Sequence, residues 1–236
     1  MFERLLRAGV LDGGSYLGID ADPANIAAAR AAQPIEMRAQ VRFECLDYRE
    51  LPARAGQCDL LVAHAFLDLL DLQSDLAGLL ELLKPGGWFY FPITYDGVTI
   101  FEPELDVELE ETIIRHYNRS MDTRQVDGRR SGDSRAGRHL LEAIPRLGAQ
   151  ILAAGASDWI VQPNPGNPSG YPADERYFLE HILHFFEETL MGRPELDQDK
   201  FQNWLARRRI QIDRAELMFI AHQLDVAGQR LEAASG

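Results

Sequence analysis

The sequence predicts an α/β fold built on a doubly wound, mostly parallel sheet. Strand and helix signals alternate through the first hundred residues, as they do in repeated βα units. A length of 236 residues suits one large domain. A composition of 46% apolar and 26% charged residues is that of a globular domain with a hydrophobic core.

The first βα unit is indicated by local signals. The apolar run Ser15–Asp20 ends in an acid and predicts a strand. Asp22 and Pro23 then provide a helix N-cap and a first-turn proline. The alanine-rich stretch Ala24–Ala32 predicts the helix that follows.

The next elements continue the alternation. Val41–Cys45 alternates with period two and predicts a strand, and Leu60–Ala63 is typical of a buried strand. Leu72–Leu83 repeats leucine at helical spacing and should stop at Lys84–Gly87, which combines a cation, a proline and two glycines. Trp88–Phe91 predicts another strand. Because ligands bind at the carboxyl ends of parallel strands, we expect the functional site at that edge.

The second half is less regular. Residues 102–137 are polar and rich in arginine, and they predict a helix followed by a mobile loop. Further helices are predicted at 137–147, 172–190 and 201–209, and further strands at 150–154, 159–161 and 217–221.

Four segments, taken together, resemble the motifs of a known family. Gly18–Pro23, Leu46–Tyr48, Asp59–His64 and Leu83–Gly87 resemble, in order and spacing, the motifs of class I S-adenosylmethionine-dependent methyltransferases. The resemblance implies a Rossmann-like methyltransferase sheet with a terminal antiparallel strand, and S-adenosyl-L-methionine as the cofactor. It also implies a single methyltransferase domain over 1–236, N-terminally incomplete, with helical cap insertions at about 102–136 and 164–210.

The residues expected to bind the nucleoside part of the cofactor lie at the ends of two strands. Asp20 is placed to accept hydrogen bonds from both ribose hydroxyls, and Ala21 is small enough for adenine to lie against the backbone. Asp47 can accept from the exocyclic amine of adenine, or merely begin a turn, and Tyr48 can wall the ring. Asp22 is interpreted as the helix cap rather than as a ligand.

The methyl end of the cofactor is expected near Ala63 and His64. Both would contact the cofactor, and His64 is also a candidate general base, although a packed imidazole explains it equally well. His181, His184 and Glu188 share one helical face. Their spacing departs from the zinc-protease motif, so we interpret them as a solvated surface and expect no metal site.

The glycine-rich loop of the family is missing from its expected place. It should lie roughly 20 residues before Asp20, where Met1–Arg7 instead reads as the helix that follows such a loop. Asp12–Gly14 lies too close to the strand to replace it. We therefore expect that the sequence as given begins after the loop, through a late-assigned start or a shortened chain, or that the protein is a degenerate relative.

Charge and cysteine content limit the partners. With 24 basic and 37 acidic residues, the net charge of −13 disfavours a nucleic-acid partner. The sequence has no signal peptide or membrane-spanning run, so no membrane partner is expected. Cys45 and Cys58 fit a reducing cytoplasm. The oligomeric state stays open.

The predicted function is methyl transfer to an O, N or C atom of a small-molecule acceptor. Phe178, Ile182 and Tyr171 are expected to line the substrate pocket, and the arginines between Arg119 and Arg138 either bind an acidic substrate or are solvated. Two alternatives stay open. One is a catalytically inactive binding module, favoured by the missing loop, and the other is a nicotinamide-dependent dehydrogenase, which Lys84–Gly87 disfavours.

Overall fold

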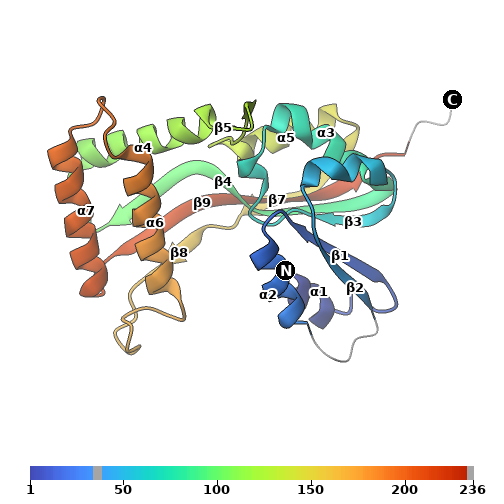
Figure 1. Ribbon diagram of the computed structural model, residues 1–236, viewed down its shortest axis with the longest axis horizontal. Coiled ribbons are helices and arrows are strands. Elements are labelled where there is room, and N and C mark those ends of the chain that lie inside the picture. The colour runs from blue at the N-terminus through green and yellow to red at the C-terminus, as the bar shows by residue number, and fades with distance from the viewer. Residues whose placement is uncertain (34–38, 233–236) are drawn as a thin grey trace.

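The structure is a computed structural model that describes residues 1–33 and 39–232, except for the side chains of residues 52 and 53. It contains a two-stranded sheet near the N-terminus, a five-stranded main sheet and a small hairpin (Figure 1). None of the helices in the described ranges is long and apolar enough to span a membrane.

The described residues of 1–47 form what we call the N-terminal unit. It consists of α1 (Phe2–Arg7), β1 (Ser15–Asp20), α2 (Pro23–Ala31) and β2 (Gln40–Cys45). The two strands are parallel and pair from Ser15↔Gln40 to Asp20↔Cys45. The predicted helix cap is confirmed, because the Asp22 carboxylate accepts a hydrogen bond of 2.8 Å from the Ala24 N–H.

The main sheet has the strand order β3-β4-β9-β7, with β8 also paired to β9. All its strands run in one direction except β9, which is antiparallel to each neighbour. This confirms a mostly parallel sheet whose last strand in the chain is antiparallel. The strands are β3 (Cys58–Val62), β4 (Leu83–Glu102), β7 (Ala149–Ala156), β8 (Trp159–Val161) and β9 (Met218–Arg230).

The division between the two sheets departs from the continuous sheet that the resemblance implied. Among the described strands, β1 and β3 each have a hydrogen-bonded neighbour on one side only. Side chains join the two parts instead, because Ile19, Leu46 and Tyr48 pack against the core of the main sheet. The N-terminal unit is therefore held by side-chain packing without a shared backbone ladder.

Strand β4 is much longer than the predicted Trp88–Phe91. Helix α3 (Leu72–Glu81) ends before Leu83, and the Lys84–Gly87 turn lies inside the strand, where the β3–β4 register shifts and Gly86 has a φ of 74°. Two later register shifts against β9 coincide with positive φ at Ile93 and Gly97. These bulges let β4 continue to Glu102.

One hydrophobic core lies between the main sheet and two helices. Phe89 and Phe91 stack with ring centroids 4.9 Å apart and contact leucines of α3 and of α5 (Ala136–Arg146). Full burial stabilises each such side chain by about 1.5–3 kcal/mol. This core includes Ala63, so it also holds the carboxyl end of β3 in place.

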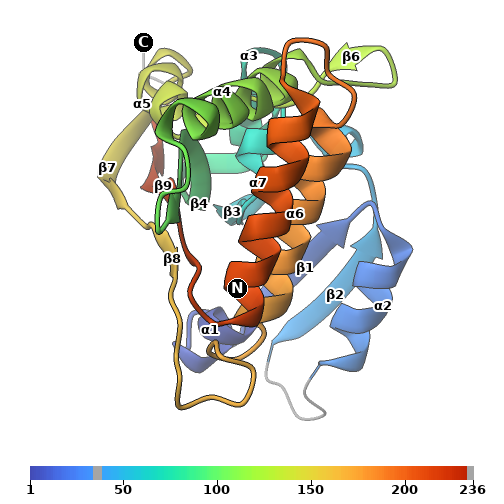
Figure 2. The same cartoon turned by 90° about the vertical axis from the view of Figure 1, so that its left-hand side faces the viewer.

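A second core lies at the far ends of β4 and β9, and we call this part the helical unit (Figure 2). Its helices are α4 (Val107–Thr123), α6 (Glu175–Leu190) and α7 (Gln198–Asp213). Phe101 is its centre and makes edge contacts with Phe186, Trp204 and Phe219. The buried Arg208 side chain pairs with Glu110, whose carboxylate also accepts from Trp204 Nε1 at 2.9 Å.

The arginine-rich segment after α4 has regular structure where we expected a mobile loop. It forms the hairpin β5 (Gln125–Val126) and β6 (Arg129–Arg130). The following residues then attach to the loop that leaves β3. Gly132 N–H donates to the Leu70 carbonyl and Asp133 N–H to the Asp68 carbonyl, both at 3.0 Å.

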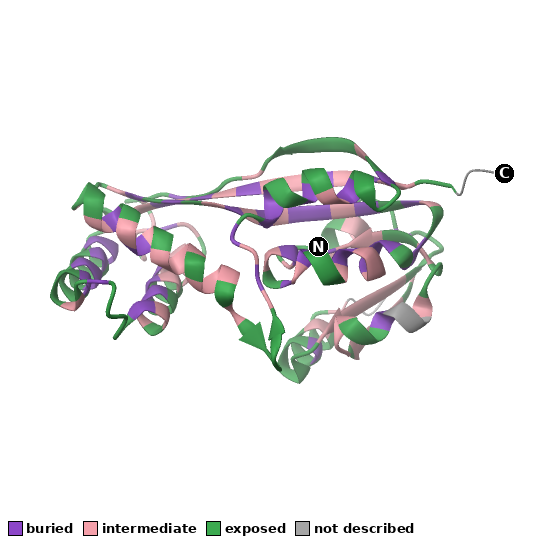
Figure 3. Ribbon diagram, turned by 90° about the horizontal axis from the view of Figure 1, so that it is seen from above, coloured by how far each residue is buried: buried purple, intermediate pink, exposed green. Residues whose placement is uncertain are grey.

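Burial is unequal along the chain. Figure 3 shows buried residues concentrated in the main sheet and the helices on it, with few in the N-terminal unit. In the described part of 1–47 the buried residues are Leu11 and Ile26. Cys45, a strand residue and so a candidate for the interior, is exposed at the end of β2, which is an edge strand of the two-stranded sheet.

Candidate functional site

Asp20 ends β1, as predicted, and its carboxylate orders the start of α2. One oxygen accepts from Asp22 N–H at 2.8 Å and the other from the Asn25 side-chain amide at 3.1 Å. A carboxylate offers about four lone-pair sites, so further donors can still bind there. Ala21 follows as an exposed small residue at the same strand end.

Asp47 lies two residues beyond the end of β2, and its carboxylate forms an ion pair with Arg49. Arg49 Nε lies 2.9 Å from each carboxylate oxygen, and the guanidinium also pairs with the carboxylate through its terminal nitrogen. These hydrogen bonds lower the pKa of Asp47 against the opposing effect of burial. Asp47 is therefore an ionised acceptor whose present partner is a side chain of the same loop.

Tyr48 is fixed by two contacts with the main body. Its hydroxyl donates to Asp75 of α3 at 2.7 Å, and its ring meets Phe66 edge-on at 5.3 Å. Burial, followed by the Asp75 carboxylate, raises the pKa of Tyr48. The ring is thus positioned beside the ends of β2 and β3, where it can form a wall.

Ala63 and His64 follow β3 directly. Ala63 is buried and donates to the Tyr90 carbonyl at 3.2 Å, and Ala65 adopts a φ of 49°, so the chain turns sharply at the exposed His64. Burial and then nearby positive charge, including that of Arg4, lower the pKa of His64. A lowered pKa keeps the imidazole neutral at neutral pH, a state that can accept a proton.

Tyr90 and Asp225 stand close to His64 and were missed in the sequence. The Tyr90 hydroxyl donates to one Asp225 oxygen at 2.7 Å, and Ile93 N–H donates to the other at 2.8 Å. Burial acts to raise the pKa of Asp225, but its polar neighbours lower it overall, and the charge of His64 adds to that effect. Burial and Asp225 together raise the pKa of Tyr90 to about 12. The pair thus combines a carboxylate with a neutral phenol.

A bulge brings this pair to the site. Ile93 has a φ of 58° where the β4–β9 register shifts, and this turns its N–H toward Asp225. In the sequence the only signal is one acid between apolar neighbours, Leu224 and Val226, in a strand predicted to end earlier.

The predicted residues are brought together in part. Ile19, Leu46 and Tyr48 pack against the core that contains Ala63, so the carboxyl ends of β1, β2 and β3 converge. The helix with His181 and His184 lies elsewhere. His184 is 3.3 Å from Glu188, and His181 stacks on Tyr177 and meets Phe185 edge-on. Within 1–33 and 39–232, no three His, Cys, Asp or Glu side chains are grouped to hold a metal ion.

Comparison with known proteins gives a family match for part of the chain and a similar fold. Residues 2–91 match the family of methyltransferase domains. No curated protein matches the sequence. A solved S-adenosylmethionine-dependent methyltransferase from Methanosarcina mazei is 11% identical, over 96% of this chain and 87% of that chain, with a TM-score of 0.52.

Two further solved structures are similar at lower scores. A putative methyltransferase from Bacillus halodurans is 10% identical over 92% of this chain and 84% of its own, with a TM-score of 0.49. The [4+2]-cyclase SpnF is 17% identical over 98% of this chain and 72% of its own, with a TM-score of 0.48. Residues 2–91 are thus similar to methyltransferase domains, and the fold of the chain is similar to that of the Methanosarcina mazei methyltransferase, in agreement with the predicted class.

Proposed function

We propose that the protein transfers the methyl group of S-adenosylmethionine to an O, N or C atom of a small-molecule acceptor, where the ends of β1, β2 and β3 converge. The observation that carries this proposal is the placement of two carboxylates at neighbouring parallel strand ends. Asp20 pairs in register with Cys45, and Asp47 follows two residues later. The Tyr90–Asp225 pair, near His64, supplies a polar group beside them.

The nucleoside half of the cofactor would be held by the N-terminal unit. Asp20 would accept hydrogen bonds from the ribose hydroxyls through its remaining lone pairs, with Ala21 beside the adenine. Asp47 would accept from the adenine amine after exchanging one hydrogen bond from Arg49, and Tyr48 would wall the ring. Arg49 can make this exchange because its side chain is partly exposed.

The methyl end would lie near Ala63 and His64. When bound, the cofactor supplies an electrophilic methyl group on a positively charged sulfur. His64 would accept the proton of an acceptor that carries one, and Asp225 would stabilise the imidazolium that results. Tyr90 is a positioning residue here, because it holds Asp225 through a 2.7 Å hydrogen bond.

The acceptor would bind under the two expected cap segments, 102–136 and 164–210, of one methyltransferase domain. Supporting this, the helical unit lies on the part of β4 beyond the end of β3, and Asp127 of the β5–β6 turn is 3.5 Å from Arg49. Phe178 and Ile182 are partly buried and remain candidates for the pocket. Tyr171 does not, because it is 0% exposed and donates to the Leu217 carbonyl.

A small-molecule partner fits the charge of the protein better than nucleic acid or an anionic membrane does. The net charge of −13 repels both of these polyanions. The two cysteines are free thiols, which is consistent with a reducing cytoplasm.

Cofactor titration tests the proposal. Isothermal titration should show saturable binding of S-adenosylhomocysteine and none of NAD. Binding of NAD alone would contradict methyl transfer and indicate a dehydrogenase. The second candidate function, an inactive binding module, is favoured by the occupation of Asp47 by Arg49. It predicts that neither S-adenosylhomocysteine nor NAD binds to the parent or to Arg49→Ala.

A further inference from the structure

A second candidate site lies between β4, α4 and the start of α5. It is an open cleft of about 540 Å³. Small-molecule sites commonly have volumes of roughly 300–1,000 Å³. Four arginines and two acids supply its charged lining, which consists of Arg115, Arg119, Arg135, Arg138, Glu111 and Asp122.

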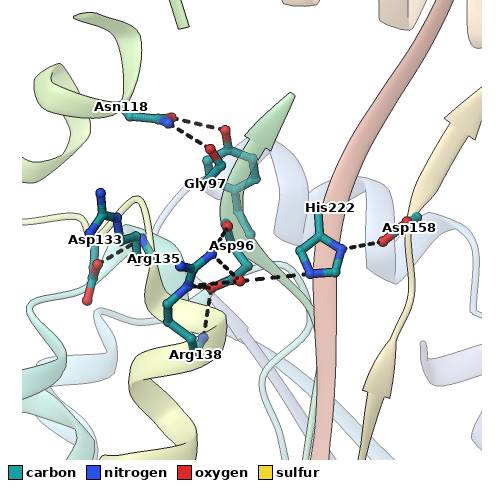
Figure 4. Close-up of polar contacts among 9 residues, drawn as sticks. Asp96, Gly97, Asn118, Asp133, Arg135, Arg138, Asp158 and His222 are labelled. Atoms are coloured by element: carbon teal, nitrogen blue, oxygen red, sulfur yellow. Dashed lines mark hydrogen bonds and ion pairs between the residues drawn. The ribbon is translucent and has the colours of Figure 1, made fainter. Parts of the chain in front are cut away.

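One of these arginines is already neutralised. Arg138 Nε lies 2.9 and 3.0 Å from the two oxygens of Asp96, whose side chain is 5% exposed, and Arg138 N–H donates to the same carboxylate at 2.9 Å. Figure 4 shows Asp96 between Arg138 and His222, with Arg138 turned toward it. Burial acts to raise the pKa of Asp96, but the bonds from Arg138 lower it overall. This ion pair fixes one wall of the cleft.

The other three arginines keep their charge available. Arg115 and Arg119 lie one helical turn apart on α4, and Arg135 stands at the start of α5. In the described part of the chain none of the three forms an ion pair within 4.0 Å. Like charges one turn apart repel each other, so this arrangement is unfavourable until an anion lies between them.

The two acids of the lining offset only part of this charge. Asp122 is engaged, since its carboxylate accepts from Ser134 N–H at 2.8 Å. Asn118 is engaged as well, donating to the Gly97 carbonyl and accepting from the Tyr95 hydroxyl. Without Arg138, which Asp96 neutralises, the lining carries three guanidinium groups against the carboxylates of Glu111 and Asp122, in a protein whose net charge is −13.

We propose that this cleft binds a small organic anion through a carboxylate or phosphate group. Guanidinium groups recognise both groups with paired hydrogen bonds. Val98 and Ile114 line the same cleft and offer an apolar surface for the hydrocarbon part of such a ligand. The positive potential of the cleft would attract an anion that the rest of the surface repels.

The cleft lies apart from the residues proposed for proton transfer, although its α4 residues belong to the expected cap segment 102–136. His64, Tyr90 and Asp225 do not belong to the lining of the cleft. Anion binding there does not depend on the proposed function, so either proposal can fail while the other holds.

The test compares two double variants with the same change in charge. Arg119→Gln/Arg135→Gln removes two guanidinium groups from the cleft. Arg129→Gln/Arg130→Gln removes two exposed arginines of β6 in the same arginine-rich segment, outside the cleft. Inorganic phosphate and succinate are titrated into each variant and the parent at low ionic strength, with heat and thermal shift as readouts.

The parent and the β6 variant should bind one of the anions saturably with equal affinity. The cleft variant should bind at least about tenfold more weakly, since each lost guanidinium removes charge-assisted hydrogen bonds. Tighter binding of phosphate would identify a phosphate ligand, and tighter binding of succinate a carboxylate ligand. Equal weakening in both variants, or no saturable binding to the parent, would overturn the proposal.

Discussion

The N-terminal unit and the helical unit differ in how many side chains they bury and in whether they match the methyltransferase family. The N-terminal unit lies within the matched residues 2–91, yet its buried side chains among the described residues are Leu11 and Ile26. The helical unit lies outside that match, and it encloses a large aromatic core and a buried ion pair. The match also includes α3 and the start of β4, which are buried in the first core, so only its N-terminal part has few buried side chains.

The contrast shows that the expected cofactor acids, Asp20 and Asp47, lie in a part of the chain with few buried side chains. The matched residues place acids at strand ends, where a cofactor can meet them, and such positions need little burial. The helical unit carries none of these acids, and it encloses the second of the two hydrophobic cores. The following predictions test this division, from the largest expected effect to the smallest.

Breaking the buried ion pair of the helical unit should have the largest effect. Glu110→Gln leaves the buried Arg208 without its charged partner, and such a loss costs about 3–5 kcal/mol of unfolding free energy. Urea denaturation followed by circular dichroism measures it. As a control, Glu187→Gln removes the partner of the half-exposed Arg209 and should cost less than about 1 kcal/mol. Similar losses for both would contradict the proposed importance of burial.

Cavity substitutions compare the two units directly. Leu183→Ala, in the helical unit, should lower the global unfolding free energy by about 2–5 kcal/mol, because Leu183 is 0% exposed. Ile26 is 4% exposed, but its unit has no backbone ladder to the main sheet. Ile26→Ala should therefore mainly reduce hydrogen-exchange protection of β1 and β2. An equal shift of the global urea midpoint by both variants would show that the two units unfold together.

The pH dependence of stability should report on Asp225, which lies on β9 of the main sheet. Its folded-state pKa is lowered, so its stabilising effect is complete above the unfolded pKa of about 3.9 and is lost as the pH falls through the folded value. Asp225→Asn should cost about 1 kcal/mol at neutral pH. That difference should vanish in acid, as urea titrations at several pH values would show. A difference that is independent of pH would indicate that the carboxylate charge is unimportant.

The sequence predicted the elements of the N-terminal unit because their signals are local. The Asp22 cap, the proline at the first turn of α2 and the alternation in β2 each involve neighbours along the chain. The strand ends that carry Asp20, Asp47 and His64 followed from the same local patterns.

The continuation of β4 and the Tyr90–Asp225 pair were not predictable in this way. Pro92, Thr94 and Gly97 interrupt the apolar pattern, and only the bulges opposite β9 absorb them into a strand. Tyr90 and Asp225 are 135 residues apart, and their contact depends on the β4–β9 register. Tyr171 was misassigned because an aromatic residue in a Pro- and Gly-rich turn suits a pocket as well as a core.

The most direct test of the proposed cofactor site compares Asp20→Ala with Asp22→Ala by titration with S-adenosylhomocysteine, beside thermal melts. Hydrogen bonds to a charged group contribute roughly 1.5–3 kcal/mol each, so Asp20→Ala should weaken binding at least about tenfold. Asp20→Asn keeps one acceptor oxygen and should lose less. Asp22→Ala removes only the cap of α2, which should cost about 1 kcal/mol of stability and leave the affinity unchanged. Parent-like binding by Asp20→Ala, or a larger loss of affinity in Asp22→Ala, would contradict the assignment of Asp20 to the ribose.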